Sequence, residues 1–199
     1  MLDRLIGSNR SLALAYDGLA DRVIAKAQQT PYSNLPGYQN RWWLVPPTTV
    51  AGLHFSARVH QILRSDLERD MHDHPCASIS VILKVGYLEH TPWRQSQPPC
   101  FDNQGLTRTR SRRPGAIIFR RATDRHRLTL HGDETCWSIF IFVSRTKLPW
   151  GFHTKNGWVW WRTYLDDWLG LESEEVARAI TRDPLVIHQI PVHAKVAIQ

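Results

Sequence analysis

Short apolar or alternating runs fill the middle of the chain, from Trp42 to Val143. Turn-forming residues separate the runs, and each run has the length of a single strand. The runs are RWWLV, TVAGLHF, ARVHQIL, SISVIL, GYLEH, AIIF, HRLTL and CWSIFIFV. A succession of this kind is typical of an all-β sandwich or barrel, and we expect its core over residues 42–143.

A different period precedes this region. Leu12, Leu19 and Val23 recur at helical spacing, which predicts a helix over residues 11–29 with Ser11 as a candidate N-cap. The prolines and glycine of TPYSNLPGYQN then interrupt regular structure before the first strand.

After the strand region, residues 144–199 form an aromatic-rich extension. Within it, ESEEVARAITR predicts a short helix and PLVIHQIPVHAKVAI an extended segment. The irregular, arginine-rich stretch RQSQPPCFDNQGLTRTRSRRPG predicts a loop between two strands. Because 199 residues suit one well-buried core and no clean boundary is visible, we expect one domain over residues 1–199.

Composition is that of a globular protein, with 42% apolar and 22% charged residues and a net charge of +7. Of the 25 basic residues, 20 are arginine, a side chain that binds carboxylates and phosphates through two parallel hydrogen bonds. A GC-rich genome would enrich arginine equally well. Nucleic acid is a less expected binding partner, because the sequence contains no helix-turn-helix pattern or other recognised nucleic-acid-binding motif.

The cysteines and the hydropathy of the chain indicate the cellular compartment of the protein. The three cysteines, Cys76, Cys100 and Cys136, are an odd number without CxxC spacing, which argues against a disulfide scaffold. The N-terminal residues lack the apolar core of a signal peptide, and no apolar run is long enough for a membrane span. We therefore expect a cytoplasmic protein that does not bind a membrane.

The sequence MHDHPCASISVILKVGYLEH raises the question of a metal site. His72 and His74 are two residues apart, so that on a strand both imidazoles point to the same face, where they can bind one ion. Ten histidines in 199 residues make about 0.5 such pairs expected by chance, so this pair alone does not predict a metal site.

Two spaced motifs strengthen the case. The chain resembles the cupin superfamily, whose first motif is G-x5-H-x-H-x3-4-E-x6-G and whose second is G-x5-P-x-G-x2-H-x3-N. His72, His74 and Gly86 match the first motif, while Gly115 and His126 match the second. The resemblance covers residues 54–143 and implies a double-stranded β-helix barrel. The whole chain is also similar to small cupin-domain proteins of phage and bacterial genomes.

The chain departs from both motifs. Ser78 or Ile79 stands where the glutamate ligand belongs, and the proline, glycine and asparagine of the second motif fall on Arg121, Thr123 and Leu130.

The resemblance therefore implies a metal site of three histidines, His72, His74 and His126. Such a set is similar to the iron(II) centre of thiol-dioxygenase cupins, which favours Fe2+, with Zn2+, Ni2+ or Mn2+ as alternatives. The other reading is that these are ordinary residues at the mouth of a barrel without a metal.

Other polar residues are candidates for the same site. Glu89 is a fourth ligand, an acceptor for an imidazole N–H, a general base, or a solvent-facing glutamate. On a strand, Asp73 points to the face opposite the two histidines. There it suits an ion pair with an arginine or a hydrogen bond that supports a metal ligand. Cys76 has the parity of His72 and His74 but is more typical of a small buried residue, and His60 of a partly buried, hydrogen-bonded one.

The arginines near His126 suit an anionic substrate. We expect Glu89 and Arg121 to act in catalysis, and Arg120 and Arg125 to bind the carboxylate or phosphate of a small molecule. A solvated basic face is the alternative. The aromatic stretch that begins at Trp150 packs against the outer sheet or a partner, or else forms a wall over the barrel mouth.

Together these observations predict a mononuclear metal-dependent cupin enzyme, an iron(II) oxygenase that acts on a small anionic substrate. The alternatives are a non-catalytic ligand-binding or phage accessory protein and a metal-dependent isomerase or lyase. Analogy with other cupins adds the expectation of a homodimer.

Overall fold

The computed structural model describes residues 2–32, 34–66, 70–94, 107–145, 148–154, 156–161 and 163–164. Cys100, the start of the arginine-rich loop, and the predicted helix and extended segment near the C-terminus lie outside the described residues.

Within the described residues the chain forms two N-terminal helices followed by strands. The helices are α1 (Leu2–Ser8) and α2 (Arg10–Ala27). The strands are β1 (Gln39–Val50), β2 (Leu53–Ile62), β3 (Met71–His72), β4 (Ala77–Lys84), β5 (Tyr87–Pro92), β6 (Thr107–Arg112), β7 (Ile117–Arg120), β8 (Arg127–Leu130), β9 (Cys136–Ser144), β10 (Gly151–Thr154) and β11 (Gly157–Trp160).

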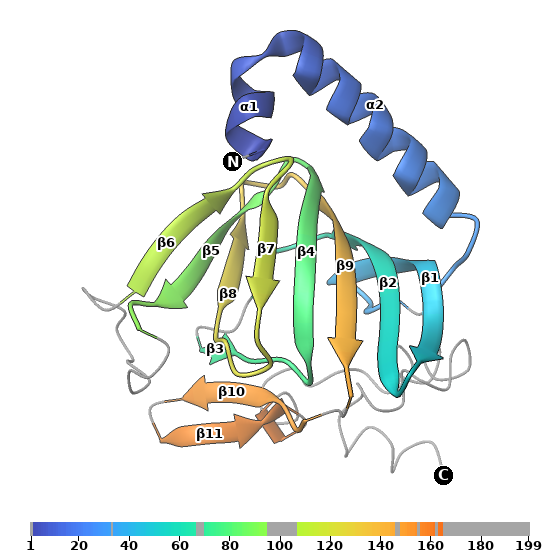
Figure 1. Cartoon of the computed structure of the whole chain (residues 1–199). Coiled ribbons are helices and arrows are strands. Elements are labelled where there is room, and N and C mark those ends of the chain that lie inside the picture. The colour runs from blue at the N-terminus through green and yellow to red at the C-terminus, as the bar shows by residue number, and fades with distance from the viewer. Residues whose placement is uncertain are drawn as a thin grey trace.

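The strands form two facing antiparallel sheets and a small third one (Figure 1). The larger sheet has the order β1-β2-β9-β4-β7, the facing sheet β6-β5-β8, and the small sheet β11-β10-β3. From β4 onward the chain passes repeatedly between the two facing sheets: β4 lies in the larger sheet, β5 and β6 in the facing one, β7 in the larger, β8 in the facing and β9 in the larger. This confirms the predicted all-β fold of the double-stranded β-helix type.

Tight turns fix the order of the strands. Val85 and Gly86, with φ of 61° and 104°, turn the chain from β4 into β5. A Cβ atom on Gly86 would lie 2.0 Å from the carbonyl oxygen of Arg112, so only glycine fits where this turn touches the end of β6. The motif glycine predicted at this position therefore has a steric reason.

The space between the sheets is divided into two halves. Near the β4–β5 turn it is apolar, and the cluster there includes Ile82, Ile118 and Leu130. Toward the other end, Ser80 and Arg120 point inward and are bonded to each other. In this half, apolar residues lie on the outer face of the same strands, where Ile79 of β4 pairs with Phe119 of β7.

The predicted N-terminal helix is present but begins earlier than expected. The N-cap is Asn9, whose side chain accepts a hydrogen bond from the Leu12 N–H at 3.1 Å, and Ser11 lies inside α2. Ala20 and Ile24 of α2 pack on Val59 and Leu83 of the larger sheet. Both helices cover one end of the barrel, opposite β10 and β11 (Figure 1).

None of the described helices combines the length and apolar composition needed to cross a bilayer.

Candidate metal centre

Backbone hydrogen bonds bring the three predicted histidines together. His72 and His126 form an isolated antiparallel bridge in which each N–H donates to the other's carbonyl oxygen at 3.0 Å. The N–H of His74 donates to the carbonyl oxygen of Ala122 at 2.9 Å, in the turn that precedes His126. The two motif segments are thus joined by main-chain contacts at the end of the barrel away from the helices (Figure 1).

The three imidazoles face one another closely enough to bind one ion. One ring nitrogen from each of His72, His74 and His126 lies within 4.8 Å of the others. Nε2 of His74 and Nε2 of His126 are 2.8 Å apart. Two nitrogens bound to one ion at about 2.1 Å, with a right angle between them, would be about 3 Å apart, so this spacing suits a shared ion.

The local electrostatics keep two of these imidazoles neutral, as ligation requires. Burial lowers the pKa of His74 well below its usual value, and the neighbouring histidines and Arg120 lower it further. Burial also lowers the pKa of His126 to about 4, assisted by the charge of Arg120 and opposed by Glu89. The donor set therefore fits a divalent ion.

Carboxylates lie behind two of the histidines. Nδ1 of His126 is 3.2 Å from Oε1 of Glu89, close enough for a hydrogen bond although its direction departs from the ideal. Nδ1 of His72 is 4.0 Å from Oδ2 of Asp66. A carboxylate behind a metal-binding imidazole fixes the ring's orientation and makes its other nitrogen a better ligand.

Glu89 on β5 is 1% exposed, so its charge needs strong partners. Its Oε2 accepts a hydrogen bond from Nε of Arg112 at 2.6 Å, and its Oε1 accepts one from Nε of Arg120 at 2.9 Å. Burial alone would raise the pKa of Glu89, but the hydrogen bond from His126 and the charges of Arg120, His126 and Arg112 outweigh it and hold the pKa far below its usual value.

The three arginines predicted near His126 have different environments. Arg120 is buried, and besides Glu89 its guanidinium donates to the hydroxyls of Ser80 at 3.0 Å and Tyr87 at 3.1 Å. The side chain of Arg121 is exposed at the end of β7. Arg125 is buried beside His126, and burial lowers its pKa while the charge of Asp73 opposes this effect.

Asp73, between the two histidines of the first motif, binds the β10–β11 hairpin. Its Oδ1 accepts a hydrogen bond from the Gly151 N–H at 2.7 Å. Its Oδ2 accepts from Nε2 of His153 at 3.0 Å and from the indole Nε1 of Trp158 at 3.1 Å. We expected Asp73 to pair with an arginine or to support a metal ligand, whereas these hydrogen bonds join it to the hairpin.

The hairpin places aromatic rings beside the histidines. The ring centroids of Trp150 and Phe152 lie 6.2 and 5.7 Å from that of His72. Phe152 also stacks on Tyr164 with centroids 4.0 Å apart. Of the two alternatives for the aromatic stretch, the described part therefore agrees with a wall at the mouth of the barrel.

The interior next to the cluster holds further polar groups. His60 on β2 is buried and stacks on Phe140, and burial followed by the charges of Arg58 and Arg41 lowers its pKa well below the usual value. Ser78, at the position of the absent glutamate, is buried, and its hydroxyl has no hydrogen-bond partner among the described residues. Cys76 is buried as expected.

Comparisons with known proteins give fold-level likenesses at low identity. No family model matches the chain. No curated protein matches it either.

Among solved structures, a polyketide cyclase from Streptomyces resistomycificus is similar at 13% identity, a TM-score of 0.42, and coverage of 61% of this chain and 79% of that one. Hydroxypropylphosphonic acid epoxidase from S. wedmorenis is similar at 13% identity and a TM-score of 0.41, over 58% of this chain and 56% of the epoxidase. A mutant oxalate decarboxylase from Bacillus subtilis is similar at 13% identity and a TM-score of 0.41, over 77% of this chain and 35% of the decarboxylase.

The chain thus spans about half of the epoxidase and a third of the decarboxylase. Because every one of these TM-scores is below 0.5, no activity, ligand or partner is carried over from these proteins.

Proposed function

We propose that the protein is a mononuclear metal-dependent enzyme in which His72, His74 and His126 bind a divalent ion. The observation that supports this proposal is the convergence of three imidazole nitrogens within 4.8 Å, two of them from side chains kept neutral by burial. Fe2+ is the favoured ion, since three neutral imidazoles leave coordination positions open for other ligands.

A bound ion would supply Lewis acidity and, if it is iron, redox chemistry with O2 as the oxidant. The protein's own residues would then bind and orient the substrate. The neutral imidazoles offer lone pairs, while the two arginines on Glu89 keep its negative charge buried next to His126.

Glu89 is proposed as a positioning residue. We expected it to act in catalysis, with a hydrogen bond to an imidazole N–H as one alternative. Both carboxylate oxygens are already bonded to arginines, and the low pKa keeps the carboxylate ionised, which leaves little capacity to take up a proton. Its position behind His126 supports an orienting role.

A small anionic substrate remains the proposed ligand, and the three arginines differ in their suitability to bind it. Arg125 is buried beside His126 and is the preferred anchor for a carboxylate or phosphate. Most N–H groups of Arg120 are engaged by Glu89, Ser80 and Tyr87, so its contribution is a fixed positive charge near His74. Arg121 acts in catalysis only if its exposed side chain turns toward the histidines.

Two other functions remain as alternatives. A metal-dependent isomerase or lyase would use the same histidines with Zn2+, Ni2+ or Mn2+ and without O2. A non-catalytic protein that binds a small ligand, or a phage accessory protein, would retain the barrel without needing the ion.

Elemental analysis tests the proposal directly. Protein purified without a metal-affinity tag is measured by inductively coupled plasma mass spectrometry, beside the His72→Ala/His74→Ala double variant and the His126→Ala variant. His54→Ala is the matched control, because His54 is exposed on β2 and bonded to Thr49. We expect near-stoichiometric metal in the wild type and in the control, and none in the cluster variants.

The identity of the metal then separates the alternatives. Iron, together with O2 consumption in the presence of small anionic thiols or carboxylates, supports the oxygenase. Zinc, nickel or manganese without O2 consumption supports an isomerase or lyase. A wild-type protein that stays metal-free after reconstitution contradicts the proposed metal centre.

A further inference from the structure

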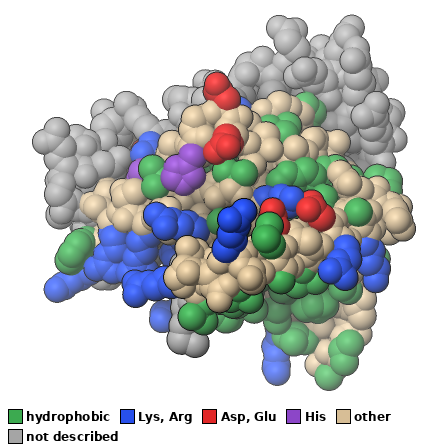
Figure 2. All heavy atoms as spheres, turned by 90° about the horizontal axis from the view of Figure 1, so that it is seen from above, with side chains coloured by type: hydrophobic (Ala, Val, Ile, Leu, Met, Phe, Trp, Pro, Cys, Tyr) green, Lys and Arg blue, Asp and Glu red, His purple; other side chains and the backbone are tan. Residues whose placement is uncertain are grey.

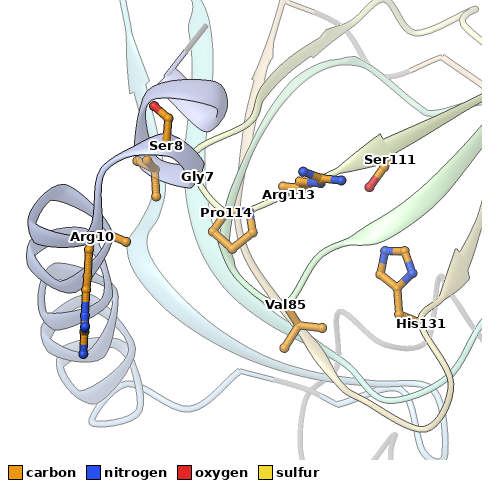
Figure 3. Close-up of a pocket in the computed structure, with 10 residues that line it drawn as sticks. Gly7, Ser8, Arg10, Val85, Ser111, Arg113, Pro114 and His131 are labelled. Carbon is orange, nitrogen blue, oxygen red and sulfur yellow. The ribbon is translucent and has the colours of Figure 1, made fainter.

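A cavity of about 630 Å³ lies at the end of the barrel opposite the histidine cluster. The N-terminal helices form one wall, and the β4–β5 and β6–β7 turns and the residue after β8 form the other (Figure 3). In Figure 3, Ser8 and Arg10 are on the helical side, while Ser111, Arg113 and His131 are on the side of the strands. The volume is in the range of sites that bind small molecules.

The polar groups of this cavity are cationic or neutral. None of the ten lining residues is acidic, whereas Arg10 and Arg113 carry positive charges. Within the described part of the chain, no hydrogen bond or ion pair engages the side chains of Arg10, Arg113 or His131. Figure 2 shows arginine and lysine side chains spread over this face, with acidic side chains beside an exposed histidine. The lining of the cavity itself therefore carries a net positive charge.

Apolar residues form the rest of the lining. Ile6 of α1 is buried, and Ala13, Val85 and Pro114 complete an apolar surface between the two polar sides. In Figure 3 the ring of Pro114 lies between Arg10 and Arg113, and Val85 lies below them, nearer His131. A ligand that fills this cavity would contact apolar surface with its body and cationic groups with its charge.

We propose that this cavity binds a phosphate group attached to an apolar body. Arg113, His131 and Ser111 can donate hydrogen bonds to it from the side of the strands, and Arg10 from the side of the helices, where the hydroxyl of Ser8 already donates to the carbonyl oxygen of Leu5. A phosphate has three terminal oxygens and accepts hydrogen bonds from several directions, so it uses this spread of donors better than a planar carboxylate does. Arg10 runs along the helical wall in Figure 3, and a change of rotamer turns its guanidinium toward the ligand.

Two sources can supply such a group. One is a free small-molecule phosphate ester. The other is a phospholipid headgroup, which the exposed Leu5, Leu14 and Leu19 of the neighbouring helices would suit. The proposal is independent of the metal centre, because none of the cluster histidines lines this cavity.

The test compares probes of matched structure on the full chain. Isothermal titration calorimetry measures binding of phenyl phosphate, inorganic phosphate and phenol, and vesicle co-sedimentation compares phosphatidylcholine with and without phosphatidic acid. The variants are Arg113→Gln and Arg10→Gln. Arg22→Gln is the control, since Arg22 is an exposed arginine of α2 that is absent from the cavity lining and its substitution removes the same charge.

We expect phenyl phosphate or phosphatidic acid vesicles to bind, with phenyl phosphate binding more tightly than inorganic phosphate or phenol. Arg113→Gln should weaken binding by about ten- to a hundredfold, the loss expected for one charge-assisted hydrogen bond, and Arg22→Gln should leave it unchanged. The arm that binds identifies the source.

Absence of saturable binding in both arms overturns the proposal. So does binding that falls equally in Arg113→Gln and Arg22→Gln, because the attraction would then come from net charge alone. Circular dichroism of each variant confirms that a lost signal is not a lost fold.

Discussion

Nδ1 of His126 lies 3.2 Å from Oε1 of Glu89, and this contact links the proposed metal centre to a buried pair of arginines. The imidazole is thus oriented from behind by a carboxylate that is itself held by Arg112 and Arg120. An ion bound at the three histidines would depend on this chain of contacts for the direction of one of its ligands.

Replacing Glu89 by glutamine should weaken metal binding about 10- to 100-fold, because the amide keeps the shape of the side chain but loses the charge that favours the Nδ1–H tautomer of His126. It should also lower the free energy of unfolding by about 3–5 kcal/mol, since two arginines lose their buried counter-charge. A competition titration with a chromogenic chelator, using Zn2+ as the probe, measures the affinity, and urea unfolding measures the stability.

The control for this variant is Glu134→Gln, an exposed glutamate in the loop before β9. It should match the wild type in both measurements. Glu89→Gln protein that is folded and binds Zn2+ as tightly as the wild type would show that His126 does not need Glu89 for its orientation.

Replacing Asp73 by asparagine should loosen the β10–β11 hairpin. The amide nitrogen of asparagine would face either the Gly151 N–H or the indole N–H of Trp158, and a buried donor opposite a donor costs about 1–3 kcal/mol. Hydrogen exchange measured by mass spectrometry should show faster exchange at residues 151–154 and little change in α2. Exchange at 151–154 equal to that of an Asp133→Asn control would contradict this role of Asp73.

The metal-free protein should lose stability as the pH falls below about 6.5. His60, His74 and His126 have pKa values lowered by burial in the folded state, to about 4 for His126. Between the unfolded and folded pKa values the unfolded chain binds more protons, so the free energy of unfolding decreases with decreasing pH, by up to about 1.4 kcal/mol per pH unit for each histidine.

Urea unfolding at a series of pH values measures this slope. His60→Gln removes one of the three groups and should make the slope shallower without altering the cluster itself. A free energy of unfolding that stays constant from pH 7 to pH 5 in the metal-free wild type would show that these histidines are protonated without cost in the folded state.

Two glycines should respond in opposite ways to substitution by alanine. At Gly86, with φ of 104°, a Cβ atom would lie 2.0 Å from a backbone oxygen, so Gly86→Ala should destabilise the protein by more than about 1 kcal/mol. Gly18 lies within α2 with nothing within 4 Å of an added Cβ, so Gly18→Ala should stabilise by about 0.5–1 kcal/mol. Thermal unfolding of both variants should show midpoints on opposite sides of the wild type.

The sequence was sufficient for most strands of the two facing sheets and for the three histidines, but not for the turn at Ala51 and Gly52 inside the run TVAGLHF or for β10 and β11. The alternation of residues 42–143 is local information, and the spacing of His72, His74 and His126 in two motifs led to side chains that the structure brings within 4.8 Å. The expectation that His72 and His74 lie on one strand was only partly correct. The strand β3 ends at His72, and a backbone hydrogen bond to Ala122 positions His74.

The partners of the charged residues could not be predicted. Glu89 accepts hydrogen bonds from Arg112 and Arg120 because β5 pairs with β6 and because β7 lies across the barrel. These contacts join residues that are far apart in the sequence, so no local pattern predicts them. The same holds for Asp73 and Trp158, and for the cavity beneath α1, a helix that the periodicity of the chain did not indicate.

In its half nearest the histidines, β4 carries Ser78 and Ser80 on the inside and Ile79 and Val81 on the outside, and Phe119 of the neighbouring strand is 73% exposed. The part of the barrel interior nearest the histidines is therefore polar and can be hydrated, while the outer surface of the same strands is apolar. For protein engineering, this means that polar substitutions suit the outer face of these strands, and apolar substitutions do not suit this part of the interior. Phe119→Lys would improve solubility without disturbing the interior, whereas Ser78→Val would make the path to the histidines unfavourable for water and for any charged molecule.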